Sequence, residues 1–107
     1  MPTADSSWLR KVTRQRETPV SLEKRRKSAA RLRAVRQQRG LTFQQVHARS
    51  QGIARKLGRK EFVISPSRLH DLEVRGVIPS IYRVYTLARV YRCTVLQVLS
   101  WYGIPKA

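Results

Sequence analysis

The residues that could act as nucleophiles, acids, bases or metal ligands are few in this chain. It has two histidines, one cysteine and six acidic residues among 107 positions. His47, His70 and Cys93 lack the paired spacing of a zinc site, and the chain has neither a nucleophile beside a base nor a glycine-rich phosphate loop. A single cysteine also excludes an internal disulfide. We therefore expect no enzyme, no metal site and no cofactor.

Positive charge is the dominant chemical property of the sequence. Twenty-three Lys and Arg residues stand against six acids, which gives a formal net charge of +17 at pH 7. Such a chain repels itself unless a polyanion neutralises it, and nucleic acid or an acidic membrane surface would do so. No apolar run approaches the roughly 18 residues of a membrane-spanning helix, and the first residues lack the apolar region of a secretory signal. For a prokaryotic source we expect a cytoplasmic, nucleoid-associated protein.

The charge is unevenly distributed along the chain. Residues 21–40 hold eight Lys or Arg residues against Glu23 alone, whereas residues 65–79 hold two basic and two acidic residues. The block at Lys24, Arg25, Arg26 and Lys27 is typical of a solvated basic surface or a clamp on phosphates. Basic flanks around a locally neutral segment favour a protein that holds phosphates with one part and reads bases with another.

Capping residues and hydrophobic periodicity predict an all-α domain of five helices over residues 21–107, preceded by a basic N-terminal arm at residues 1–20. The first helix starts near Thr18-Pro19, with Ser21 and Ser28 as alternative caps, and stops at Gly40. The second is capped by Thr42, with Gln45 completing a capping box, and stops at Gly58; Gly52 within it could mark a break. The remaining three helices are capped by Ser65, Ser80 and Thr94, and an extended connector precedes Ser65.

The apolar residues recur at spacings of three and four, which predicts the inward face of each helix. In chain order the predicted inward residues are Ala29, Leu32 and Val35; Phe43, Val46, Ser50, Ile53 and Leu57; Leu69 and Leu72; Ile81, Val84, Tyr85, Ala88 and Tyr91; and Val95, Val98, Leu99 and Tyr102.

Four segments, taken in order, resemble a known family of DNA-binding proteins. They are "LRAVRQQRGLTFQQV", "ISPSRLHDLE", "VIPSIYRVYTLARVY" and "CTVLQVL". Together they resemble the Cro and lambda-repressor type of helix-turn-helix, often called XRE-like, over roughly residues 29–102. The resemblance implies a five-helix lambda-repressor-like fold whose third helix, from Ser65 to Arg75, lies in the major groove of double-stranded DNA.

The resemblance also implies roles for individual side chains. The outward residues of the third helix, which would face base edges, are Ser67, Arg68, His70 and Asp71. Arg68 could pair with guanine and Asp71 with cytosine, or the two could hold each other. Leu69 and Leu72 belong to the core, and Glu73 is structural or faces a neighbouring helix. The candidates for phosphate contacts are Thr42, Gln44, Arg75, Ser80 and Arg83, together with the basic block Lys24, Arg25, Arg26 and Lys27.

The chain departs from the family pattern at several positions. About a dozen extra residues lie between the second and third helices, around residues 51–63, and they could extend the second helix outward. Phe43 stands where many relatives have a glutamine that contacts phosphate. Pro66 stands at a position that often reads a base, and Gly76 comes one residue later than usual.

These features predict a sequence-specific transcriptional regulator, with a repressor favoured over an activator. The resemblance implies a homodimer on palindromic DNA with half-sites ~34 Å apart, and a monomer whose arm wraps the duplex is the alternative. One alternative is a basic architectural or RNA-binding protein without sequence readout. Another is an antitoxin-like module that binds a protein through the insertion or the tail "LSWYGIPKA". A membrane partner is not expected, because the basic residues adjoin helices whose apolar faces are needed for the core.

Overall fold

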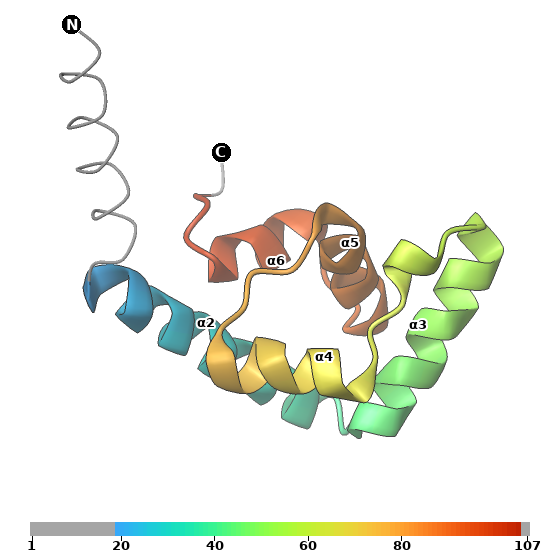
Figure 1. Cartoon of the computed structure of the whole chain (residues 1–107), viewed down its shortest axis with the longest axis horizontal. Coiled ribbons are helices and arrows are strands. Elements are labelled where there is room, and N and C mark those ends of the chain that lie inside the picture. Colours follow the sequence, from blue (N-terminus) through green and yellow to red (C-terminus); the bar gives the residue numbers. More distant parts are fainter. Residues whose placement is uncertain (1–18, 106–107) are drawn as a thin grey trace, which may run out of the picture.

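The computed structural model of the chain describes residues 19–105, with side chains from residue 23 onward, and this part is entirely helical. Figure 1 shows the helices labelled α2 (Pro19–Gln38), α3 (Phe43–Leu57), α4 (Pro66–His70), α5 (Ile81–Val90) and α6 (Val95–Trp101). A π-helical segment, Asp71–Arg75, continues α4, and a 3₁₀ turn, Lys60–Phe62, follows α3. The expected all-α class is confirmed. The expected arm at residues 1–20 lies almost wholly outside the described residues.

The predicted helix starts at Thr42, Ser65, Ser80 and Thr94 are confirmed by their capping hydrogen bonds. The Thr42 hydroxyl accepts from the amide of Gln45 at 3.1 Å, and the Gln45 side chain accepts from the Thr42 amide at 2.9 Å. The same reciprocal pair joins Thr94 and Gln97, and the Ser65 hydroxyl accepts from the Arg68 amide at 3.2 Å. Each cap satisfies amides that would otherwise have no partner in the first turn of its helix.

The hydrophobic core lies where all the described helices meet. Its fully buried members are Leu32 of α2, Val46 of α3, Leu69 and Leu72 of α4 and its π-helical continuation, Leu87 and Tyr91 at α5, Val98 of α6, and Ile64 before α4. Most of the predicted inward residues are therefore in the core. The prediction was wrong for four residues. Ile81, Leu57 and Val95 lie at helix ends and are 77%, 46% and 39% exposed, and Tyr85, within α5, is 36% exposed.

The chain between α3 and α4 does not form the extended connector that its composition predicts. Its first part is the 3₁₀ turn, and only the residues after Phe62 are extended. The Phe62 ring lies edge-on to Tyr82 at 5.3 Å, and the Phe62 carbonyl accepts from the Thr86 hydroxyl at 2.7 Å. Ser50 accepts from the Ile64 amide at 3.0 Å. The extra residues thus lengthen α3, and the turn that follows packs against α5.

Gly52 does not break α3, which is regular from Phe43 to Leu57. A Cβ atom added at Gly52 would meet nothing within 4 Å, so no neighbouring residue requires a glycine there. Glycine inside a helix is less favourable than alanine by about 1 kcal/mol. The packing of the fold therefore gives no reason for this residue.

Two tyrosine hydroxyls are buried without a hydrogen-bond partner among the described residues, those of Tyr91 and Tyr102. Burial, and then the negative charge of Glu73, raise the pKa of both phenols. Above about pH 10, where an unfolded chain releases phenol protons, the folded chain holds more protons than the unfolded one, so the free energy of unfolding falls as pH rises.

We expect Tyr91→Phe with Tyr102→Phe to unfold at the same or higher urea concentration than the wild type at pH 7, because a partnerless buried hydroxyl contributes nothing favourable. At pH 11 the double variant should be clearly more stable than the wild type. Urea titrations at both pH values check this. Equal alkaline sensitivity of the two proteins would show that the hydroxyls are solvated.

Candidate nucleic-acid interface

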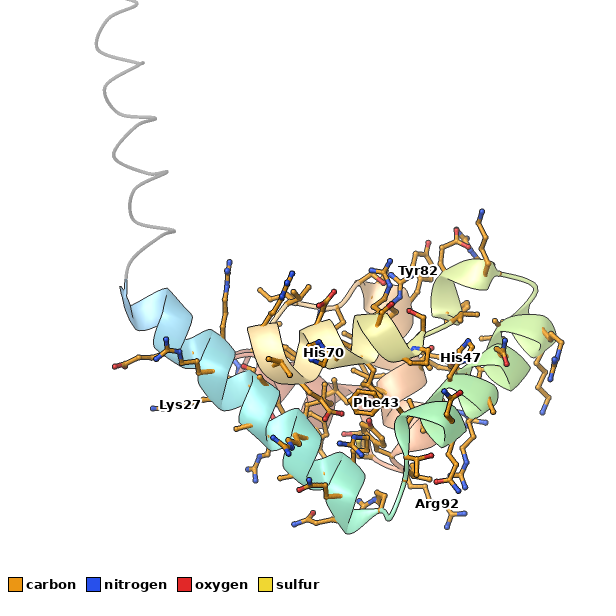
Figure 2. All side chains as sticks on the ribbon, turned by 60° about the horizontal axis from the view of Figure 1, so that its bottom comes forward. Lys27, Phe43, His47, His70, Tyr82 and Arg92 are labelled. Carbon is orange, nitrogen blue, oxygen red and sulfur yellow. The ribbon has the colours of Figure 1, made fainter. Side chains whose placement is uncertain are left out.

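The candidate base-reading surface, here called the reading face, is the outer side of α4 and its π-helical continuation, made of Ser67, Arg68, His70 and Asp71. Residues 66–75, which carry it, are called the reading segment. Figure 2 shows this segment with His70 labelled on its outer side. Leu69 and Leu72 on the opposite side are fully buried, whereas Ser67, Arg68 and His70 are exposed and Asp71 is half-buried. The alternation therefore leaves four polar side chains on one side of a segment that is fixed to the core.

Asp71 is paired within its own helix, but not with Arg68. Its carboxylate lies 3.7 Å from Nε of Arg75 and 4.0 Å from Nδ1 of His70. Arg68 therefore does not pair with Asp71, which was one of the two alternatives for this residue. Arg75, a candidate for phosphate contact, is the basic partner of Asp71 in this structure. An exposed pair of this kind contributes only about 0–1 kcal/mol, so a stronger anion can displace it.

The late position of Gly76 has a backbone explanation. Residues Asp71–Arg75 form a π-helical turn, and Gly76 ends it with φ of +67°. A π turn holds one residue more than an α turn, and such turns are frequent at functional sites. The extra residue is thus accommodated while both Leu72 and Glu73 stay buried.

Arg36 of α2 holds the reading segment in place. Its Nε and one terminal nitrogen donate to the two carboxylate oxygens of Glu73 at 2.7 and 3.0 Å, and its other terminal nitrogen donates to the Leu41 carbonyl at 2.8 Å. The guanidinium also lies 4.6 Å from the ring centre of Phe43. The hydrogen bond to Glu73 raises the pKa of Arg36. One side chain therefore joins α2, the start of α3 and the end of the reading segment.

This arrangement explains two of the sequence expectations. Glu73 faces a neighbouring helix, as predicted, and only 2% of its side-chain surface is exposed. Phe43, noted above as a departure from the family pattern, places its ring against the guanidinium of Arg36. A bidentate pair with stacking against an aromatic ring suits arginine and not lysine, because only the guanidinium is planar and forked.

The other expected phosphate contacts are partly engaged within the protein. The hydroxyls of Thr42 and Ser80 cap α3 and α5, yet each is exposed and can still donate its proton to a phosphate. Gln44 is exposed in the first turn of α3. Arg83 is half-buried, and its Nε donates to the Val63 carbonyl at 3.0 Å. Burial, and then the positive charge of Arg68, lower the pKa of Arg83. Arg83 therefore supports the connection before α4.

Tertiary packing brings the basic block on α2 to the end of the reading segment. Lys24, Arg25, Arg26 and Lys27 are all exposed. A Cβ atom built on Gly76 would overlap the backbone carbonyl group of Arg25, so the two segments touch directly. Figure 2 shows Lys27 on α2 to one side of His70. The phosphate-binding candidates of α2 thus flank the base-reading candidates.

A second group of basic residues was not singled out from the sequence. Arg49 and Lys56 on α3 line one groove with Arg89 and Arg92 at the end of α5. The spacing of seven residues places Arg49 and Lys56 on one side of α3, which is a signal in the sequence. Arg92 lies in the turn after Val90, the last residue of α5. That these residues line one groove follows only from the packing of α3 against α5.

The described residues 19–105 include no cluster of three His, Cys, Asp or Glu side chains that could hold a metal ion. Within the same range no helix is long and apolar enough to cross a membrane. Comparison with models of protein families, with curated proteins and with solved structures finds no match to this chain.

Proposed function

We propose that this protein is a sequence-specific DNA-binding transcriptional regulator, most simply a repressor, of lambda-repressor-like architecture. The observation that carries the proposal is the reading face: three exposed polar residues and the half-buried Asp71 on a neutral helix whose buried side is fixed by Leu69, Leu72 and Glu73. A helix held this firmly can present side chains to base edges in a constant register, which direct readout requires.

Affinity and specificity divide between different parts of this surface. The basic block on α2 lies at one end of the reading segment and supplies phosphate contacts, which act on any sequence. The capped start of α3 supplies the first-turn amides of Phe43 and Gln44, which precede the first hydrogen bond of that helix, from Val46 to Thr42. Such amides suit a phosphate oxygen. Base preference then rests on Ser67, Arg68, His70 and Asp71.

The test is selection of random duplex DNA on the full-length protein at about 150 mM salt with excess competitor DNA. An enriched motif supports the proposal, and a palindromic motif supports a homodimer with half-sites ~34 Å apart. Tight, salt-sensitive binding without a motif contradicts it and favours an architectural or RNA-binding protein. Absence of DNA binding contradicts it as well and favours the antitoxin-like interaction module.

Arg68→Ala should relax the preference at one base position and weaken the preferred site by about 1–3 kcal/mol, because a bidentate contact to a base is lost. Lys27→Ala is the charge-matched control: it should weaken all sequences alike and lower the salt dependence by about one phosphate contact. Fluorescence anisotropy on the preferred duplex and on single-base variants measures both. Uniform weakening by Arg68→Ala would refute the base-reading role.

A further inference from the structure

The α3–α5 groove is an open hollow of about 430 Å³ on the protein surface. Its lining residues are Arg49, Gly52, Ile53 and Lys56 of α3, and Arg89, Val90 and Arg92 at the end of α5. Four of the seven carry a positive charge and none carries a negative charge. All four charged side chains are exposed.

The positive charges of the α3–α5 groove are not compensated within the described part of the chain. The ion pairs there involve Arg36, Arg59, His70 and Arg75, and none of the groove residues. Arg39 donates to the Tyr91 carbonyl and Arg83 to that of Val63, whereas no side-chain hydrogen bond between residues 23 and 105 uses Arg49, Lys56, Arg89 or Arg92. Four like charges around one hollow repel each other, so an anionic ligand would relieve the repulsion.

Two residues of the groove are unfavourable for the local backbone. Gly52 does not interrupt α3, and a Cβ atom added there would meet nothing within 4 Å. The absence of a side chain therefore leaves the floor of the groove open. Arg92 has φ of +56° and is the only non-glycine residue of the described chain with positive φ. A glycine or asparagine would fit that conformation with less strain. Strained residues of this kind gather at functional sites, and here the arginine adds a fourth charge to the groove.

The α3–α5 groove and the reading face are built from different elements: α3 and the end of α5 form the groove, and α4 with its π-helical continuation forms the reading face. In Figure 2, His70 marks the reading face and Arg92 marks the groove, and Phe43 at the start of α3 lies between them.

We propose that the α3–α5 groove binds the phosphate backbone of a second DNA duplex, so that one protein molecule joins two duplexes. Cationic side chains from both walls, above an open floor, fit a chain of phosphates. An acidic peptide fits less well, because only Ile53 and Val90 are apolar and Val90 is 5% exposed, which leaves little surface to recognise peptide side chains. This second site goes beyond the proposed function, and it does not require base reading by α4.

The experiment is a bridging assay with the full-length protein. A biotinylated duplex on beads captures the protein, and recovery of a second, fluorescent duplex measures bridging, while anisotropy measures binding to a single duplex. The groove variant is Arg89→Ala with Arg92→Gly. The control is Arg55→Ala with Lys60→Ala, which removes the same charge from exposed positions outside the groove. Thermal unfolding confirms folding, and Arg92→Gly should not lower stability because it relieves positive φ.

We expect the groove variant to recover on the order of tenfold less second duplex, and its bridging to lose about two units of salt dependence, because two phosphate contacts are removed. Its affinity for a single duplex should change no more than that of the control pair. Gly52→Gln, which fills the floor without a change in charge, should also reduce bridging.

Four results would overturn the inference. They are bridging that is unchanged in the groove variant, an equal loss of bridging in the control pair, a loss of single-duplex binding that matches the loss of bridging, and displacement of the second duplex by polyglutamate at equal charge concentration. The third result would make the groove part of one DNA surface, and the fourth would assign it to an acidic protein. The motif obtained by selection tests the reading face separately, so either proposal can fail alone.

Discussion

Glu73→Ala should lower the free energy of unfolding by about 3–5 kcal/mol, since it leaves the Arg36 guanidinium largely buried without its carboxylate partner. Glu73 accepts two hydrogen bonds from Arg36, at 2.7 and 3.0 Å, and the Arg36 side chain is only 14% exposed. Breaking such a pair costs more than the pair contributes, because the remaining charge keeps its desolvation penalty. Urea denaturation followed by circular dichroism measures the loss.

The matched control is the double variant Arg36→Met with Glu73→Leu. It removes both charges and fills the space with apolar side chains, which is often neutral or stabilising for a buried pair. We expect it to recover most of the stability lost in Glu73→Ala. If both variants lose the same stability, the contribution of Glu73 comes from packing and not from its charge.

Gly76→Ala should be destabilising by about 2–5 kcal/mol, for two reasons that add. An L-residue at φ of +67° costs about 1–2 kcal/mol. The new methyl group would also overlap the backbone of Arg25, and overpacking costs about 1–3 kcal/mol more because neither backbone can move freely. Relief of the overlap would push the end of the reading segment away from α2, so sequence preference should fall along with stability.

Gly58→Ala separates the two contributions. Gly58 ends α3 with φ of +71°, close to the φ of Gly76, and a Cβ atom there would meet nothing within 4 Å. It should therefore show only the conformational cost. The difference between the two variants in urea denaturation isolates the contact between the reading segment and α2. Equal losses would mean that α2 moves aside without cost.

The sequence was most informative about local structure. The caps at Thr42, Ser65 and Thr94 were predicted because each is a hydroxyl that bonds to an amide three residues further along, and no distant residue takes part. The helix ends at Gly58 and Gly76 follow from the left-handed backbone that glycine adopts easily. The scarcity of reactive residues and the large positive charge are likewise properties of the composition alone.

Periodicity was less informative about exposure. It identifies the apolar side of a helix, but it does not show whether another element covers that side at each end. Ile81 begins α5 on its predicted inward side and is nevertheless 77% exposed. The residues between α3 and α4 gave a similar error, since their β-branched and aromatic composition predicted an extended strand-like connector. Packing of Phe62 against Tyr82 and hydrogen bonds to α5 favour a turn there instead.

The sequence by itself thus determined where the helices lie, which residues cap them and which class of ligand suits the charge, because these depend on neighbours in the chain or on composition. The tertiary structure alone decided which charges are neutralised and which remain free. Arg36 and Glu73 are 37 residues apart and form a buried pair, whereas Arg49 of α3 and Arg92 in the turn after α5 line one groove that contains no acidic residue. Both outcomes depend on how whole helices pack, and that packing is set by the core side chains of all of them together.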